Sequence, residues 1–132
     1  MGTRSLTFVY DSNDKPLVCM YRQFDGYPSG HGKELAEFLK PLKMVNGLGV
    51  DVRNVANGAG CLAAQMVAHF KNGPGGIYLY APEPGADHWQ DFEYHVYASD
   101  EGIRVRVTDP NTQIFEGSVE AFLQFCTKRE EE

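Results

Sequence analysis

The spacing of hydrophobic and polar positions divides the chain into short strands and short helices. Apolar runs bounded by Gly, Pro, Asn and Asp are typical of strands, whereas apolar residues at positions i, i+3 and i+4 are typical of helices. The first pattern predicts strands over residues 4–10, 16–22, 76–81, 91–98, 103–108 and 113–116. The second pattern predicts helices over residues 33–39, about 60–71 and from Ser118 onward.

The order of these elements predicts the fold class. Strands linked by short turns pair antiparallel, and the helices then gather on one face of the sheet. We therefore expect an α+β fold, with a mainly antiparallel sheet of about five or six strands and two or three helices packed on one face. Residues 1–132 are expected to form a single domain, because domains commonly have about 100–150 residues. Residues 41–56 have no clear pattern, although Val50, Asp51 and Val52 are a candidate strand.

The charge balance argues against two classes of partner. Twelve Lys and Arg residues against eighteen Asp and Glu residues give a formal net charge of −6. Proteins that bind duplexes usually concentrate positive charge, because neutralising phosphates drives much of their affinity. The basic residues of this chain are scattered, so we expect neither nucleic acid nor an anionic membrane as the main partner. No stretch approaches the ~20 apolar residues that span a bilayer.

The cysteines and histidines predict neither disulfides nor a metal site. Cys19, Cys61 and Cys126 are far apart and odd in number, and each lies in an apolar stretch where a free Cys acts as a small hydrophobe. Together with the missing signal peptide, this predicts a cytoplasmic protein. The four histidines lack metal-binding spacing, so we expect no metal and no cofactor.

The stretch from Gly58 to Ala63 matches G-x-G-x-x-A at the start of a helix. A dinucleotide site also needs a firm preceding strand in a βαβ unit, which the pattern does not supply, so the glycines are expected to let the helix start approach a neighbour closely. Cys61 lies in the first helical turn, where the helix dipole can activate a thiol. A Cys nucleophile also needs a His base, and no motif links Cys61 to one. We therefore expect Cys61 to be buried and slow to react.

The glycine-rich segment from Arg22 to Lys33 is the strongest candidate for a site. It joins a strand to a helix, and free N–H groups at the helix start would suit a phosphate or carboxylate. It is not a P-loop, because Gly26 lies one residue too far from Gly32-Lys33 for G-x-x-x-x-G-K. The alternative is that the segment has only a structural role. It would then form a tight corner that Asp25 caps and against which aromatic residues pack. The residues expected to converge on one surface spot and bind a ligand are Arg22, Asp25, Tyr27, Ser29, His31 and Lys33.

The hairpin over residues 91–108 offers a second polar set. A two-residue turn at 100–101 would place Val96 opposite Val105 and Tyr94 opposite Val107. The other face would then present Glu93, His95, Tyr97, Arg104 and Arg106. This set would either bind an anion or form the solvated side of an antiparallel sheet.

A resemblance to a group of small uncharacterised proteins of bacteriophages and some bacteria rests on three segments. These are MGTRSLT, MYRQFDGYPSGHGKELAEFL, and NGAGCLAAQMVAHFK followed by GGIYLY. Members of the group often begin M-G-T-R-S and have a later D-G-Y-P-x-x-H-G. The resemblance implies an accessory protein of phage or bacterial origin that works inside a bacterial cell. It implies no activity, so no catalytic residue is transferred.

Three functions remain open on these grounds. The leading hypothesis is a non-enzymatic protein that binds a protein partner or a small anionic ligand through the 22–33 loop. The second is a small hydrolase or transferase that uses Cys61 or the Arg22, Asp25 and His31 loop. The third is a structural interaction module, in which a sheet face or edge forms a homodimer. The absence of a complete catalytic constellation in the sequence favours the first hypothesis over the second.

Overall fold

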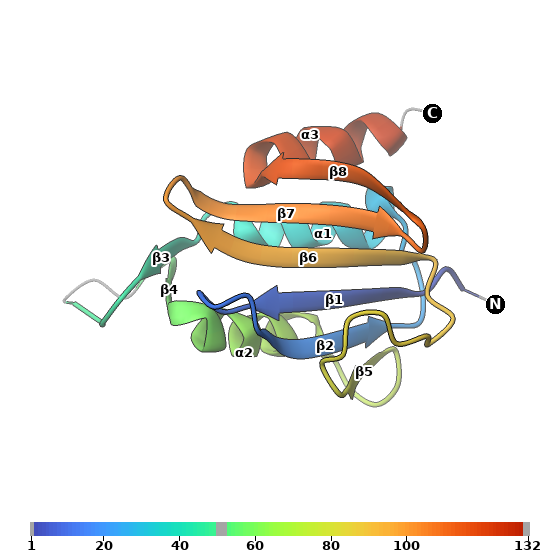
Figure 1. Ribbon diagram of the computed structural model, residues 1–132, viewed down its shortest axis with the longest axis horizontal. Coiled ribbons are helices and arrows are strands. Elements are labelled where there is room, and N and C mark those ends of the chain that lie inside the picture. Colours follow the sequence, from blue (N-terminus) through green and yellow to red (C-terminus); the bar gives the residue numbers. More distant parts are fainter. Residues whose placement is uncertain (1, 50–52, 131–132) are drawn as a thin grey trace.

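The structure is a computed structural model that describes residues 2–49 and 53–130, and a six-stranded sheet forms its centre (Figure 1). The strands are β1 (Ser5–Tyr10), β2 (Pro16–Arg22), β5 (Ile77–Tyr80), β6 (Phe92–Ser99), β7 (Gly102–Asp109) and β8 (Thr112–Ser118). Across the sheet their order is β5-β2-β1-β6-β7-β8. Neighbouring strands pair antiparallel except β1 and β6, which run parallel.

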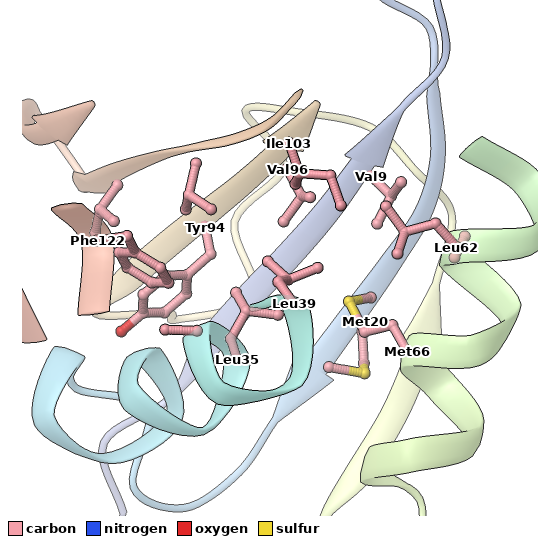
Figure 2. Packing of buried hydrophobic residues seen from close by; sticks show 14 of the residues in the cluster. Val9, Met20, Leu35, Leu39, Leu62, Met66, Tyr94, Val96, Ile103 and Phe122 are labelled. Atoms are coloured by element: carbon pink, nitrogen blue, oxygen red, sulfur yellow. The ribbon is translucent and has the colours of Figure 1, made fainter. Parts of the chain in front are cut away.

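The helices α1 (Lys33–Leu39), α2 (Gly58–Phe70) and α3 (Val119–Glu130) pack on one face of this sheet. Apolar side chains at helical spacing, such as Leu35 and Leu39 of α1, turn toward the strands and exclude water from the inner face. Figure 2 shows the buried cluster that results, with side chains from β1, β2, β6 and β7 meeting those from the helices. The Ala121 N–H donates to the Ser118 hydroxyl at 3.2 Å, so Ser118 caps α3, close to the predicted start of this helix.

The predicted α+β class, the mainly antiparallel sheet and the helices on one face are confirmed. The hairpin register is also confirmed, because Val96 pairs with Val105 and Tyr94 pairs with Val107. The boundaries move by one or two residues, most visibly at α2, which begins at Gly58. Periodicity identifies an element well but locates its ends less well, because capping and fraying are decided by local contacts.

Two segments differ from the prediction. The 22–33 segment was expected to be a loop that joins a strand to a helix, but within it Pro28–Gly32 forms a π-helical turn, η1, that leads directly into α1. Pro28 begins the turn, where a missing N–H is not needed. In the segment 41–56, β3 (Lys43–Val45) and β4 (Val55–Asn57) pair parallel in a separate small sheet. The candidate strand at Val50, Asp51 and Val52 lies outside the described residues.

The face of the main sheet away from the helices, here called the outer face, is not simply solvated. Leu6, Phe8, Cys19 and Tyr21 form a second buried cluster on it. His95, expected on this polar face, is only 4% exposed, because its ring stacks on Phe8 with the centroids 5.3 Å apart. The expectation of a solvated side is therefore wrong at His95.

Candidate functional site

Residues 22–33 form a tight corner between β2 and α1. Asp25 has φ 60°, a left-handed conformation that turns the chain. A Cβ atom at Gly26 would stand 2.8 Å from the Arg4 carbonyl carbon, and one at Gly32 would stand 2.8 Å from Cys126 Sγ. The Tyr94 hydroxyl donates to the Gly26 carbonyl at 2.7 Å. The glycines thus let the corner press against β1, β6 and α3, as the structural alternative requires.

The backbone N–H groups at the start of α1 are already engaged within the corner. The His31 N–H donates to the Asp25 carbonyl at 2.7 Å, and the Gly30 and Gly32 N–H groups donate to the Tyr27 carbonyl. The Lys33 N–H donates to carbonyl groups within η1. The predicted anion cradle of free N–H groups is therefore not present, because the π-helical turn uses these donors itself.

His31 lies in the core and not at the surface spot where it was expected. Its Nε2 is 2.8 Å from the Thr7 hydroxyl, and Arg22 Nη1 donates to its Nδ1 at 3.2 Å. Because Arg22 can only donate, Nδ1 carries no proton and Nε2–H donates to Thr7. Burial, helped by the Arg22 charge, lowers the pKa of His31 to about 3. His31 is therefore a neutral structural residue, held against the Tyr94 and Phe70 rings.

Arg22 connects this core histidine to the surface. Its guanidinium donates to the Phe24 carbonyl at 2.7 Å and forms an ion pair with Glu34 of α1. The Arg22 side chain is 17% exposed and that of Glu34 is 51% exposed. The positive charge of Arg22 is thus largely compensated by Glu34 before any ligand binds.

All predicted site residues except His31 line one small pocket of about 240 Å³, here called the corner pocket. Its walls come from the corner and from α1, whose Glu34 and Glu37 were not predicted. The Tyr27 hydroxyl donates to Asp25 Oδ1 at 3.3 Å, and the Asp25 charge raises the pKa of Tyr27. The complete lining is Arg22, Asp25, Tyr27, Ser29, Gly30, Lys33, Glu34 and Glu37.

A larger hollow of about 570 Å³ shares Arg22, Glu34 and Glu37 with the corner pocket. We call it the ring hollow, because aromatic rings of α1, α2 and the corner line it. The remaining lining residues are Phe24, Phe38, His69, Phe70, Asn72, Gly75, Gly76 and Ile77. The sequence pattern did not predict this site. The spacing of Glu34, Glu37 and Phe38 at i, i+3 and i+4 was the available signal that they share one helix face.

The helix start at Gly58 also differs from expectation. A Cβ atom at Gly58 or Gly60 would meet no atom within 4 Å, so the predicted close approach is wrong, and Gly58 instead supplies a φ of +85°. Cys61 is half-buried and not buried as predicted, and its thiol donates to Gln65 Oε1 at 3.4 Å. In the part of the chain that the structure describes, no histidine contacts this thiol.

Comparison of the chain with protein-family models, curated proteins and solved structures finds no match. Among the helices of the described residues, none combines the length and the apolar character that crossing a membrane requires. Within residues 2–49 and 53–130, no group of three or more His, Cys, Asp or Glu side chains is placed to hold a metal ion. The geometry and charge of the pockets are therefore the basis for a functional argument.

Proposed function

We propose that this protein is a non-enzymatic binding protein that recognises a partner protein by accepting one of its Arg or Lys side chains in the ring hollow. The observation that carries the proposal is Glu37, an exposed carboxylate in the wall of the hollow. Within the described residues, its side chain has no hydrogen bond or ion pair. An unpaired carboxylate at the edge of a concave aromatic surface suits a cation.

The charge balance around the hollow supports a basic occupant. Arg22 and Glu34 compensate each other in an ion pair, which leaves Glu37 as the uncompensated charge among these three residues. The whole chain has a formal net charge of −6, which favours encounter with basic partners over long distances. Attraction between charges of opposite sign raises the association rate and selects the partner more than it sets the final affinity.

Aromatic rings form the other half of the recognition surface. The Phe38 ring lies 4.8 Å from His69 and 6.2 Å from Phe70, centroid to centroid, so the rings make a continuous wall. Phe24 of the corner, which is 56% exposed, also lines the hollow. A cation over such rings gains about 0.5–2 kcal/mol, and the aliphatic stem of Arg or Lys packs on apolar surface.

The two alternatives for the 22–33 loop receive less support from the geometry. A small anion would meet three carboxylates in the corner pocket, those of Asp25, Glu34 and Glu37, beside the two cations Arg22 and Lys33. It would also find the helix N–H groups engaged. An enzyme built on His31 would need a base that reaches substrate, whereas His31 is fully buried with a pKa lowered to about 3. We retain the phage or bacterial setting as part of the proposal, on the resemblance alone.

Selection of peptides from a surface-displayed random library tests the proposal. We expect the full-length protein to enrich peptides that contain Arg or Lys. The variant Glu37→Gln should bind the enriched peptides about fivefold more weakly, which corresponds to a partly exposed ion pair of ~1 kcal/mol. Glu101→Gln is the matched control, because Glu101 lies in the β6–β7 turn and its loss changes the net charge equally.

Two results would contradict this function. Enrichment of acidic peptides would show that the site prefers anions. Equal weakening by Glu37→Gln and Glu101→Gln would show that only the overall charge of the protein matters, and that the ring hollow is not the binding site.

A second candidate, the homodimer, is favoured by the free edge of the sheet at β5. This strand lies at the end of the strand order, and Tyr78, Leu79 and Tyr80 are all exposed. An exposed hydrophobic edge strand invites pairing with another strand. Sedimentation equilibrium should then give a dimer, and Leu79→Lys should shift it toward the monomer. A monomer at high protein concentration would exclude this candidate.

A further inference from the structure

A separate pocket of about 350 Å³ opens on the outer face of the sheet, and nothing proposed above uses it. We call it the outer pocket, and Tyr10, Asp14, Tyr97 and Arg106 line it. Tyr10, Tyr97 and Arg106 come from β1, β6 and β7, and Asp14 comes from the turn that follows β1. It shares no lining residue with the corner pocket or the ring hollow.

The two charged side chains of the outer pocket are unpaired. In the part of the chain that the structure describes, neither Arg106 nor Asp14 makes a side-chain hydrogen bond or an ion pair. The contrast with Arg104, two residues earlier on the same face of β7, is informative. Arg104 Nε lies 3.7 Å from Glu116 Oε2 of β8. Arg106 pairs across the sheet with His95 and Glu116 in backbone register, and its side chain lines the outer pocket.

The hydroxyl of Tyr10 is oriented by a partly buried chain of hydrogen bonds. His95 Nε2 lies 3.3 Å from Glu93 Oε1, and Gln90 donates to the other oxygen of Glu93 at 2.7 Å. With the imidazole neutral, Nε2 carries the proton because a carboxylate only accepts. His95 Nδ1 then accepts the Tyr10 hydroxyl proton, at a distance of 2.6 Å. The Tyr10 oxygen is left with its lone pairs for the pocket.

The surroundings hold this arrangement in place and keep Tyr10 protonated. The His95 ring stacks on Phe8, which is fully buried. Burial raises the pKa of Tyr10 to about 12, so the phenol keeps its proton and donates it to His95. In the outer pocket Tyr10 therefore acts as an acceptor, as Asp14 does, whereas Arg106 acts only as a donor.

We propose that the outer pocket binds a free α-amino acid in its zwitterionic form. Arg106 would receive the carboxylate, Asp14 and the Tyr10 oxygen would receive the ammonium group, and the Tyr97 ring would contact the amino-acid side chain. A pocket with one unpaired cation, one unpaired anion and an aligned acceptor is complementary to a ligand that has both charges close together. A volume of about 350 Å³ is at the small end of ligand pockets, as a single amino acid requires.

Titration of the ¹⁵N-labelled full chain with small molecules tests this assignment. The probes are L-phenylalanine and L-leucine, with 3-phenylpropanoate and 2-phenylethylamine as analogues that lack the ammonium and the carboxylate. We expect at least one amino acid to give saturable amide shifts on the outer face of β1, β6 and β7. Each analogue should bind about tenfold more weakly than L-phenylalanine, because each loses one charge-assisted contact.

Variants place the ligand within the pocket. Arg106→Gln and Asp14→Asn should each weaken amino-acid binding by about tenfold. Tyr10→Phe should weaken it less, because the ammonium keeps its contact with Asp14. Arg104→Gln is the matched control, since it removes the same charge from the same face of β7 but outside the pocket, and it should leave binding unchanged. Asn suits position 14, where φ is 61°.

Several outcomes would overturn the assignment. One is the absence of saturable shifts with either amino acid up to about 10 mM, a concentration that detects even weak binding. Another is 3-phenylpropanoate binding as tightly as L-phenylalanine, which would make the site a simple anion site. Equal losses from Arg106→Gln and Arg104→Gln would place the ligand elsewhere. None of these results bears on the ring hollow, whose test uses peptides and Glu37.

Discussion

Two buried histidines on opposite faces of the same sheet differ in the charge of their neighbours. His31 lies under the helices between the Thr7 hydroxyl and Arg22, and His95 lies on the outer face between the Tyr10 hydroxyl and Glu93. Both rings pack against aromatic side chains. His31 faces a cation, so protonation would bury two positive charges together, whereas His95 faces a carboxylate.

The different neighbours give the two histidines different roles: His31 is a structural residue, and His95 is a residue that positions Tyr10. Complete burial, and to a smaller extent the Arg22 charge, keeps His31 neutral, and its hydrogen bond to Thr7 ties the corner to β1. His95 donates to Glu93 and accepts from Tyr10, and the hydrogen bond from His95 also lowers the pKa of Glu93. His31 supports the walls of the corner, and His95 sets which hydrogen-bonding group Tyr10 offers to the outer pocket. Burial of a histidine alone therefore says little about its role.

The largest expected effect comes from removing the ring of His31. His31→Ala should lower the free energy of unfolding by about 3–5 kcal/mol, because it leaves a cavity and deprives Thr7 and Arg22 of a partner. Urea unfolding measures this. His69→Ala is the control, since His69 is exposed and its loss should cost less than about 1 kcal/mol. Equal losses in the two variants would refute the structural role of His31.

The next largest loss of stability is expected from disturbing the close packing of the corner formed by residues 22–33. Gly32→Ala should lower the free energy of unfolding by about 1–3 kcal/mol, because its Cβ atom would lie 2.8 Å from Cys126 Sγ and 3.3 Å from the Tyr94 ring. Thermal and urea unfolding measure it. Gly60→Ala is the control, because no atom lies within 4 Å of a Cβ there and α2 has a helical backbone at that position. It should be neutral or slightly stabilising.

Lowering the pH should reduce the free energy of unfolding through His31 before it does so through most carboxylates. Burial and the Arg22 charge lower the pKa of His31 from its ordinary value of about 6.5 to about 3 in the folded protein, so between these values the unfolded chain binds a proton that the folded protein does not. This contribution is fully present above pH 6.5 and falls, as pH drops toward 3, by up to about 1.4 kcal/mol per pH unit.

Urea unfolding between pH 6.5 and 5 measures this slope before most carboxylates titrate. The variant His31→Gln should have a flatter dependence of unfolding free energy on pH over this range. The slope is the readout, so a lower stability of the variant does not obscure the result. An unchanged slope would show that His31 does not govern the acid sensitivity.

A smaller effect is expected at the hydroxyl partners of the two histidines. Tyr10→Phe should cost about 1 kcal/mol of unfolding free energy, because water at the half-buried Tyr10 position can replace the lost hydrogen bond. Thr7→Val should cost more, because Thr7 is fully buried and Nε2–H of His31 would have no partner. The reverse order would contradict the assignment of His31 as the more completely enclosed ring.

The smallest expected effect is a difference in the rate at which the cysteine thiols are labelled. Cys126 reports on the corner and Cys19 reports on the outer face. Burial raises the pKa of Cys126 near the corner to about 12 and that of Cys19 under the outer face to about 11. The half-buried Cys61 should therefore react first with iodoacetamide, as mass spectrometry would detect. In Gly32→Ala, labelling should accelerate at Cys126 and not at Cys19. Equal acceleration at both would indicate global unfolding rather than local opening of the corner.

Much of the local structure and part of the candidate site followed from the sequence. Apolar positions at i, i+3 and i+4 marked α1, and a two-residue turn predicted the pairing of Tyr94 with Val107. The convergence of Arg22, Asp25, Tyr27, Ser29 and Lys33 at one pocket also agrees with the compact loop that its glycines implied. These features depend on residues near one another in the chain, so backbone geometry and short turns suffice to place them.

Which side chains are buried, and which residues they contact, was decided only by the tertiary structure. His31 sits in a polar, glycine-rich segment, yet it is buried because Thr7, Phe70 and Tyr94 surround it from distant segments. The parallel pairing of β1 with β6 joins residues 5–9 to residues 92–96, which brings Tyr10 to His95. Periodicity reports which face of an element is apolar, but not which other element covers that face. That choice follows from the packing free energy of the whole core, to which residues far apart in sequence contribute together.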